Sequence, residues 1–157
     1  MDILQRLNAI EEELSGWALE KEDRDSIRKV LDETIYPEEL LEIQSKYDLV
    51  EQEFSIPGDE NPSEIGVELE WMSPQEVISE ALEAFPGKPA LKKGYLPLGT
   101  CLAGSGDPYF VQHTADQNWR LVRIPHTAVS ADYEEIIEDR VEFIGELSIL
   151  FSSEYLV

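Results

Sequence analysis

The residues best suited to chemistry lie in one stretch, from Gly94 to His126. Its clustered glycines are of the kind that cradle phosphate, and Cys101, His113 and His126 could supply a nucleophile, a base or metal ligands. A phosphate-binding loop also needs a Lys-Ser/Thr pair and a following helix whose N-terminus meets the anion. Here Asp107 and a proline follow the glycines, and an acid at that place would repel phosphate. The glycines therefore predict a tight turn.

Metal or nucleophilic chemistry finds little support in the spacing of Cys101, His113 and His126. They are too far apart for a compact zinc signature, and one thiol with two imidazoles leaves a tetrahedral site one ligand short. Both histidines are expected at exposed strand ends. A cysteine–histidine pair would need local signatures that are missing here, and no spacing of acids resembles a calcium loop. We therefore expect no catalytic residue, no metal and no cofactor.

The same stretch has the pattern of a small sheet. Short apolar runs bounded by turn residues predict three strands, at 95–98, 109–113 and 119–124. Glycine, aspartate and asparagine predict the turns between them, at 104–107 and 115–118. Pro97 indicates an edge strand or an irregularity. A fourth strand is predicted at 65–71, where apolar residues alternate with Gly66, Glu68 and Glu70, and residues 51–63 are expected to form a loop.

Apolar residues at helical spacing predict helices around this sheet. Near the N-terminus, helices are expected over 2–14, from about 23 to 31, and from 37 to 47. Residues 73–76 have the pattern of a capping box with proline in the first turn, which predicts a middle helix that ends at Pro86-Gly87. The buried faces of these helices are expected to include Val30, Leu82 and Phe85.

A last helix is predicted over about 133–151, capped by Asp132, with an apolar stripe that runs from Tyr133 to Phe151. Together these elements predict an α+β fold in a single domain over 1–157, with a helical extension at 1–20 and a core at 22–152. Its central, mostly antiparallel sheet is expected to be flanked by N-terminal helices, a middle helix and a C-terminal helix.

The charge of the chain is extreme, because 34 acidic residues face 12 basic ones and give a net charge of −22. Residues 1–60 carry 18 acids against 6 bases, residues 132–157 carry 8 against 1, and residues 94–131 are balanced. Such a surface repels nucleic acid and anionic membranes and is complementary to a basic protein surface. The alternative is that the acidity only keeps the protein soluble.

One cysteine, Cys101, excludes an intramolecular disulfide and indicates a reducing compartment. The N-terminal region lacks the basic and apolar parts of a signal peptide, and no apolar run has the length of a membrane span. We therefore expect a cytoplasmic protein that is a monomer or a weak homodimer.

The residues expected to contact a partner are two tryptophans and three acids: Trp17, Trp71, Glu68, Glu70 and Asp107. Trp17 and Trp71 are open to two interpretations, packing in the core or anchoring an interface beside the acidic surface. Trp119 is expected in the core. Asp107 is first a turn residue and second a contact.

The order of motifs also carries a resemblance. A helix that opens on Ile35-Tyr36-Pro37-Glu38-Glu39 precedes VELEWMSPQEV, then YLPLG, GSGDPYFV and VRIPH, and finally DYEEIIEDRVEFIGEL. Over residues 22–152 this order resembles the SUKH superfamily, the Smi/Knr-like proteins. The positions that carry it are Tyr95, Leu96, Leu98, Gly99, Gly106, Asp107, Tyr109, Val122 and His126. The chain departs from the family pattern after Tyr47, where a glycine-rich loop is absent, and at Asp132-Tyr133, where Ser-Phe is usual.

The resemblance implies an α+β binding domain, and many bacterial members of this superfamily are immunity proteins that neutralise a toxin, often a nuclease. We therefore expect a non-catalytic immunity protein that binds a cognate toxin, or another basic protein, through its acidic surface. A regulatory interaction module of the same fold, without a toxin, is the second hypothesis. An enzyme built on Cys101, His113 or His126 is the third.

Overall fold

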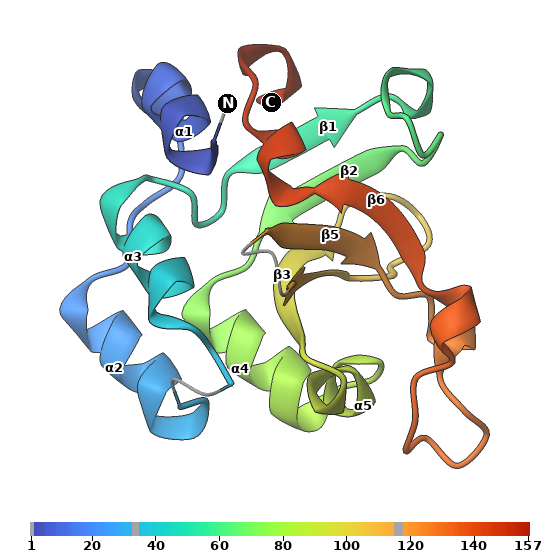
Figure 1. Ribbon diagram of the computed structural model, residues 1–157. Coiled ribbons are helices and arrows are strands. Elements are labelled where there is room, and N and C mark those ends of the chain that lie inside the picture. The colour runs from blue at the N-terminus through green and yellow to red at the C-terminus, as the bar shows by residue number, and fades with distance from the viewer. Residues whose placement is uncertain (1, 33–34, 115–117) are drawn as a thin grey trace.

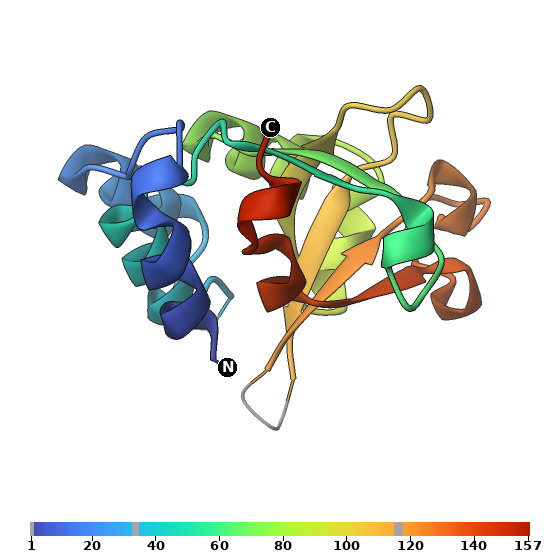
Figure 2. The same ribbon diagram turned by 90° about the horizontal axis from the view of Figure 1, so that it is seen from above.

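The structure, a computed structural model, describes residues 2–32, 35–114 and 118–157. Across them the chain forms five α-helices, a six-stranded antiparallel sheet and several short 3-10 turns, which confirms the predicted α+β class. The N-terminal helices form a layer beside the curled sheet (Figure 1). The C-terminal segment lies between that layer and the sheet (Figure 2).

The N-terminal layer consists of α1 (Ile3–Ile10), α2 (Lys21–Val30) and α3 (Glu38–Lys46). Asp2 and Gln5 form a capping box that starts α1, whose Leu7 and Ile10 are buried in the same cluster as the sheet. The segment 1–20, predicted as an extension, thus contributes to the core. Val30 was predicted to face inward, but it lies at the end of α2 and is 42% exposed, so that prediction is wrong.

The sheet is a meander in which each strand pairs with the next along the chain. Its strands are β1 (Glu53–Ile56), β2 (Val67–Trp71), β3 (Tyr95–Cys101), β4 (Tyr109–His113), β5 (Trp119–Arg123) and β6 (Glu142–Glu146). The four predicted strands are confirmed as β2 to β5, and the predicted turn at 104–107 joins β3 to β4. The other predicted turn, at 115–118, falls on residues 115–117, outside the described residues.

Pro97 marks an irregularity, as predicted, because the register of β3 against β4 shifts between Pro97 and Gly99. It does not mark an edge, since β3 lies between β2 and β4.

Both faces of the curled sheet bury apolar side chains. One face carries Leu69, Trp71, Tyr109 and Leu121 into the main core, where the N-terminal helices also pack. The opposite face contributes to a second, smaller cluster, which α5 and the segment after β5 cover: Ala90, Tyr95, Phe110, Val122, Ile124, Ala128 and Ile136. The second cluster does not extend to β1 and β2, so the polar side of these two strands stays uncovered.

Two helices, α4 (Pro74–Glu83) and α5 (Gly87–Lys92), connect β2 to β3. The predicted capping box is confirmed: Ser73 Oγ accepts a hydrogen bond from the backbone N–H of Glu76, whose side chain accepts one from the N–H of Ser73. Leu82 and Phe85 were predicted to be buried, but both are 39% exposed, so the inward face of α4 is narrower than predicted. None of the helices in the described residues is long and apolar enough to cross a membrane.

The predicted C-terminal helix is wrong. Residues 142–146 form β6, which pairs with β5, and Leu147–Leu150 follow as a 3-10 turn. Asp132 does not cap a helix: its carboxylate accepts hydrogen bonds from the Ser130 hydroxyl at 2.6 Å and the backbone N–H of Glu134 at 3.1 Å, which closes a local turn. Pairing with β5 satisfies the backbone of 142–146 across the sheet, and Gly145, at φ 159°, accommodates the shift in register there.

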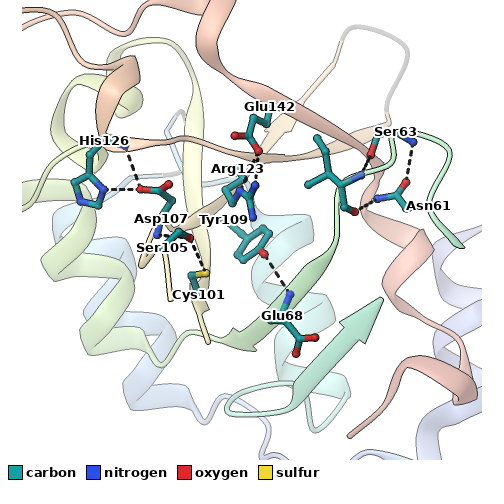
Figure 3. Close-up of polar contacts among 11 residues, drawn as sticks. Asn61, Ser63, Glu68, Cys101, Ser105, Asp107, Tyr109, Arg123, His126 and Glu142 are labelled. Atoms are coloured by element: carbon teal, nitrogen blue, oxygen red, sulfur yellow. Dashed lines mark hydrogen bonds and ion pairs between the residues drawn. The ribbon is translucent and has the colours of Figure 1, made fainter. Parts of the chain in front are cut away.

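The predicted loop at 51–63 contains a strand, β1, which forms one edge of the sheet. The end of the chain covers that edge: Leu156 forms a bridge with Phe54, and the backbone N–H of Val157 donates to the Glu53 carbonyl at 3.2 Å. Between β1 and β2, the buried Asn61 side chain donates to the Ile65 carbonyl and accepts from the Ser63 N–H (Figure 3). The connection is therefore anchored by hydrogen bonds.

Candidate functional site

Five carboxylates gather where β1, β2 and the first turn of α4 meet. We call Glu51, Glu53, Glu68, Glu70 and Glu76 the acidic face. Their position follows from strand alternation, because Phe54, Ile56, Val67, Leu69 and Trp71 enter the core and leave the intervening residues on the other side. The antiparallel register sets Glu53 directly opposite Glu70, and Ser55 opposite Glu68. Two like charges therefore stand side by side across the strand pair.

The neighbouring carboxylates of the acidic face affect the pKa of Glu70. Partial burial raises the pKa of the Glu70 carboxyl above its usual range, and the negative charges of Glu76, Glu53 and Glu51 raise it further. The ion pairs of the described residues lie elsewhere and join Arg28, Lys93, Arg123 and His126 to other acids. Within the described chain, no ion pair neutralises the acidic face.

A shallow hollow of about 380 Å³ lies next to the acidic face, between α4 and the start of the β3–β4 loop. Glu76 and Glu80 line it, and Glu76 accepts a hydrogen bond from the Thr100 hydroxyl at 3.3 Å. Glu80 accepts from the backbone N–H of Gly87 at 2.9 Å. Burial raises the pKa of the Glu80 carboxyl, although the Gly87 N–H and the nearby His126 oppose this rise. The hollow therefore extends the negative surface toward α5.

A polar network crosses the sheet behind Glu68 (Figure 3). The Glu68 backbone N–H donates to the hydroxyl of Tyr109 at 3.2 Å. Arg123, opposite Tyr109 in the register, donates twice to the Glu142 carboxylate, at 2.6 and 3.0 Å. Burial raises the pKa of the Tyr109 hydroxyl above its usual value. This network fixes the backbone of β2 and thus the direction in which Glu68 and Glu70 point.

Trp71, one of the predicted contact residues, lies in the core. Its side chain is 1% exposed and its indole N–H donates to the buried Gln44 side chain at 2.9 Å. The odd–even alternation of β2 sends Trp71 to the face opposite Glu68 and Glu70. The sequence left two interpretations open for Trp71, packing in the core and anchoring of an interface. Its burial supports packing, so the prediction that Trp71 contacts a partner is corrected.

Trp17 lies beside the segment that leads into the acidic face, because it pairs with Val50, the residue before Glu51. It is half-buried against the main core and forms an isolated bridge with Val50, to which it is joined by two backbone hydrogen bonds. Trp119, predicted as a core residue, is buried in the main cluster. Of the predicted contact residues, Glu68 and Glu70 lie together on the acidic face.

Asp107 stands at the end of the β3–β4 loop and holds the segment that follows β5 (Figure 3). Its carboxylate lies 2.6 Å from His126 Nδ1 and accepts from the His126 backbone N–H at 3.2 Å. Asp107 is partly buried, whereas the His126 side chain is largely exposed. Both partners of this pair were singled out in the sequence, and their contact gives Asp107 a structural role.

Among the residues with nucleophilic or ligating capacity, Cys101 and His126 are joined only indirectly, through Ser105 and Asp107, because Ser105 Oγ accepts from the Asp107 backbone N–H at 3.4 Å. Cys101 Sγ lies 3.5 Å from Ser105 Oγ, and His126 is bonded to Asp107. His113 ends β4, as predicted, but is half-buried, and its ring stacks on Trp119 at a centroid distance of 4.4 Å. In the part of the chain that is described, no group of three or more histidine, cysteine or acidic side chains is placed to hold a metal ion.

Sequence reasoning missed Glu51, Glu53 and Glu76 as members of the acidic face. Glu53 fell in a predicted loop, and Glu76 was interpreted only as a helix cap. The alternation of polar and apolar residues over 53–56 was the available signal, since it matches the alternation of β2.

The chain matches no protein-family model, and the searches of curated proteins and of solved structures give no significant match.

We predict that Glu70→Gln stabilises the fold at pH 7. A carboxyl whose pKa is raised in the folded state contributes stability below its unfolded pKa of about 4.3, and this contribution is lost as pH rises through the folded pKa. Glutamine removes the repulsion, so the free energy of unfolding should rise by up to about 1 kcal/mol at low salt, a limit that allows for solvent screening.

Urea denaturation at pH 7 and pH 4 measures this effect. The difference between Glu70→Gln and the wild type should shrink toward pH 4 and also with added salt. Glu42→Gln, at an exposed position on α3, is the matched control and should have a smaller effect. A Glu70→Gln protein that is less stable than the wild type at pH 7 would contradict the repulsion.

Proposed function

We propose that this chain is a protein-binding domain that engages a basic surface of another protein through the acidic face. The single observation that carries the proposal is the set of carboxylates on β1, β2 and α4 that stand together without an ion pair in the described chain. Adjacent like charges destabilise a fold, so a surface that retains them is suited to a partner that supplies the opposite charge.

The hollow between α4 and β3 supports the same function. It is shallow, and the carboxylates of Glu76 and Glu80 that line it would accept the ammonium or guanidinium group of a lysine or arginine side chain. The net charge of −22 would add long-range attraction, which speeds the encounter with a basic partner and weakens as salt is added.

The finer proposal is an immunity protein whose partner is a toxin, such as a nuclease that is basic where it grips nucleic acid. It rests on the resemblance to the SUKH superfamily in sequence and on the fit between an acidic face and such a toxin. The regulatory module without a toxin would use the same face for another basic protein, so the two proposals differ in the partner and not in the site.

The test is co-expression and direct binding with any toxin-like domain that is encoded beside this gene. We expect protection of the host cell and a one-to-one complex whose association rate falls as salt increases. Glu68→Lys/Glu70→Lys should lower the affinity about tenfold or more and should also remove the protection. Surface plasmon resonance at several salt concentrations measures both effects.

Glu39→Lys/Glu42→Lys is the matched control, because it changes the net charge equally on α3, away from the acidic face. An equal loss of affinity in this control would show that only total charge matters and would overturn the assignment to the acidic face. If the neighbouring domain neither bound nor was neutralised, the immunity role would be abandoned.

A further inference from the structure

A second surface, formed by α4, α5, the segment after β5 and Ile35, exposes a cluster of apolar side chains. Ile35, Leu82, Leu91, Phe85 and Tyr133 lie on it, and we call these five residues the apolar patch. Ile35, Leu82 and Leu91 line a shallow hollow of about 410 Å³ together with Lys88 and Lys92. Four of the five patch residues are exposed, and Leu91 is half-buried. Clustered apolar exposure of this kind marks an interaction surface.

Two contacts of the Phe85 ring make the patch continuous. The Phe85 ring packs against the Tyr133 ring at a centroid distance of 5.3 Å, and the Lys88 ammonium lies over the Phe85 ring at 5.6 Å. Lys88 also lines the hollow between Ile35 and Leu91. The two aromatic rings thus extend the hollow, and α4 and α5 beneath them lie side by side (Figure 1).

Tyr133 is held outward by its backbone. Its φ of 63° is unusual for a residue other than glycine, and its side chain is 62% exposed. A bridge between Val129 and Ile136 closes the turn around it, and the Tyr133 N–H donates to the Ser130 carbonyl at 2.9 Å. A bulky aromatic side chain is therefore fixed on the surface in a conformation that costs about 1–3 kcal/mol, which suits a preformed contact.

The charges around the apolar patch nearly balance, unlike those of the chain as a whole. Its rim carries three lysines and four acids: Lys88, Lys92, Lys93, Glu83, Asp132, Glu134 and Glu135. Lys92 donates to the backbone carbonyl of Glu134 at 3.1 Å, and Lys93 lies 3.9 Å from the Glu135 carboxylate. The rim thus carries both signs in nearly equal number, whereas the whole chain has a net charge of −22.

We propose that the apolar patch is the interface of a symmetric homodimer. In a two-fold interface the same patch meets itself, so it must be self-complementary in shape and charge. The lysines of one copy would meet the glutamates of the other around a centre formed by Leu82, Phe85 and Tyr133. A second copy approaching the acidic face would meet carboxylates with carboxylates, which costs free energy. At the apolar patch the lysines offset most of the local acidic charge, so two copies repel less there than at the acidic face.

The proposal predicts an unusual response to salt. The two copies carry −22 each and repel one another at long range, whereas the apolar contact hardly depends on salt. Added salt should therefore strengthen the dimer. A separate acidic protein bound to the three lysines would dissociate under the same conditions, so the direction of the salt effect distinguishes the two occupants.

Sedimentation velocity of the full chain tests the proposal at several concentrations in about 0.05 M and about 0.5 M NaCl. We expect the weight-average mass to rise from 17.9 kDa toward twice that value, at lower protein concentration in the higher salt. Leu82→Glu should raise the dimer dissociation constant at least about tenfold, because it buries an unpaired charge at the centre of the interface. Lys88→Glu should also weaken the dimer, because it replaces a rim lysine that would meet a glutamate of the other copy.

Leu102→Glu is the matched control, because Leu102 is similarly exposed in the β3–β4 loop, outside the apolar patch. It should leave the dimer unchanged, and circular dichroism should show that all variants are folded. A wild type that stays monomeric in both salts, or a dimer that survives both Leu82→Glu and Lys88→Glu, would overturn the proposal. Binding through the acidic face is measured separately and does not depend on this outcome.

Discussion

Replacing Trp71 by alanine should destabilise the fold by about 3–5 kcal/mol, which is the cost of deleting a large buried aromatic side chain. Trp71 is 1% exposed and packs against Phe54 and Phe151, with ring centroids 6.4 and 6.2 Å away. Because small domains are stable by only about 5–15 kcal/mol, the variant should melt many degrees below the wild type or fail to fold at 37 °C.

The loss would include hydrogen bonds as well as packing. Gln44 accepts from the Trp71 indole N–H at 2.9 Å and donates to the Tyr36 hydroxyl at 2.7 Å and to the Leu40 carbonyl at 3.0 Å. Without the indole, the buried amide oxygen of Gln44 would lose its donor, at a cost of about 1–3 kcal/mol that is part of the total. Trp71→Phe isolates the cost of the lost hydrogen bond, because it keeps most of the ring volume and removes the N–H.

Thermal and urea denaturation of Trp71→Ala, Trp71→Phe and Trp17→Ala would test this role. Trp17 is half-buried, so its replacement should cost less than that of Trp71. If Trp71→Ala retained wild-type stability and lost only partner binding, the interpretation of Trp71 as a contact residue would regain its place and the core assignment would fail.

The central strands β2 to β5 could be predicted because local pattern and tertiary environment agree there. Residues 65–71 alternate strictly, and the structure buries Val67, Leu69 and Trp71 in β2. Likewise, the capping box at Ser73 needs only four residues to form, so no distant contact could override it. These elements are determined by short-range physics.

The C-terminal segment could not be predicted in this way, because its structure depends on a distant strand. Ile144, Leu147 and Phe151 are buried, as a helical stripe would require, yet the same spacing is met by a strand followed by a 3-10 turn. What decides the outcome is that the free edge of β5 needs a partner, and local periodicity does not contain that information. The predicted stripe also placed Tyr133 in the interior, whereas its ring lies on the apolar patch.

Only part of the acidic face could be predicted from the sequence. Glu68 and Glu70 were found because they alternate with apolar residues, but their neighbours Glu53 and Glu76 come from other elements. Pairing of β1 with β2 and the start of α4 bring these carboxylates together. Which of 34 acids converge is a property of the topology, and single-sequence pattern reasoning does not reach it.

The acidic face and the apolar patch respond to salt in opposite directions. Binding of a basic partner relies on attraction between unlike charges, which salt screens, whereas self-association is opposed by repulsion between like copies, which salt also screens. Low salt should therefore favour a monomer bound to its partner. One salt series therefore distinguishes the two surfaces, because added salt should weaken binding of the basic partner and strengthen the homodimer.

Gly99→Ala is the second substitution with a large expected effect. A Cβ atom at Gly99 would lie 2.3 Å from Leu69 Cγ and within 2.8 Å of both Leu69 methyl groups, closer than any real contact. Leu69 is fully buried, so it has no free space into which it can rotate. We expect Gly99→Ala to lower the free energy of unfolding by about 1–3 kcal/mol or more, as in other overpacked cores.

A double-mutant cycle with Leu69→Ala identifies the cause. Leu69→Ala alone should cost about 2–5 kcal/mol, but the double variant should cost less than the sum by about 0.5–3 kcal/mol, because the added methyl group enters the space that leucine leaves. Gly104→Ala is the control: it has no atom within 4 Å of its added Cβ and should change stability by less than about 0.5 kcal/mol. Strict additivity of Gly99→Ala and Leu69→Ala in urea denaturation would show that the clash is not what excludes a side chain at position 99. A coupling of the expected sign would show that glycine at 99 is required by the close approach of β2 to β3, the contact that sets the strand carrying Glu68 and Glu70.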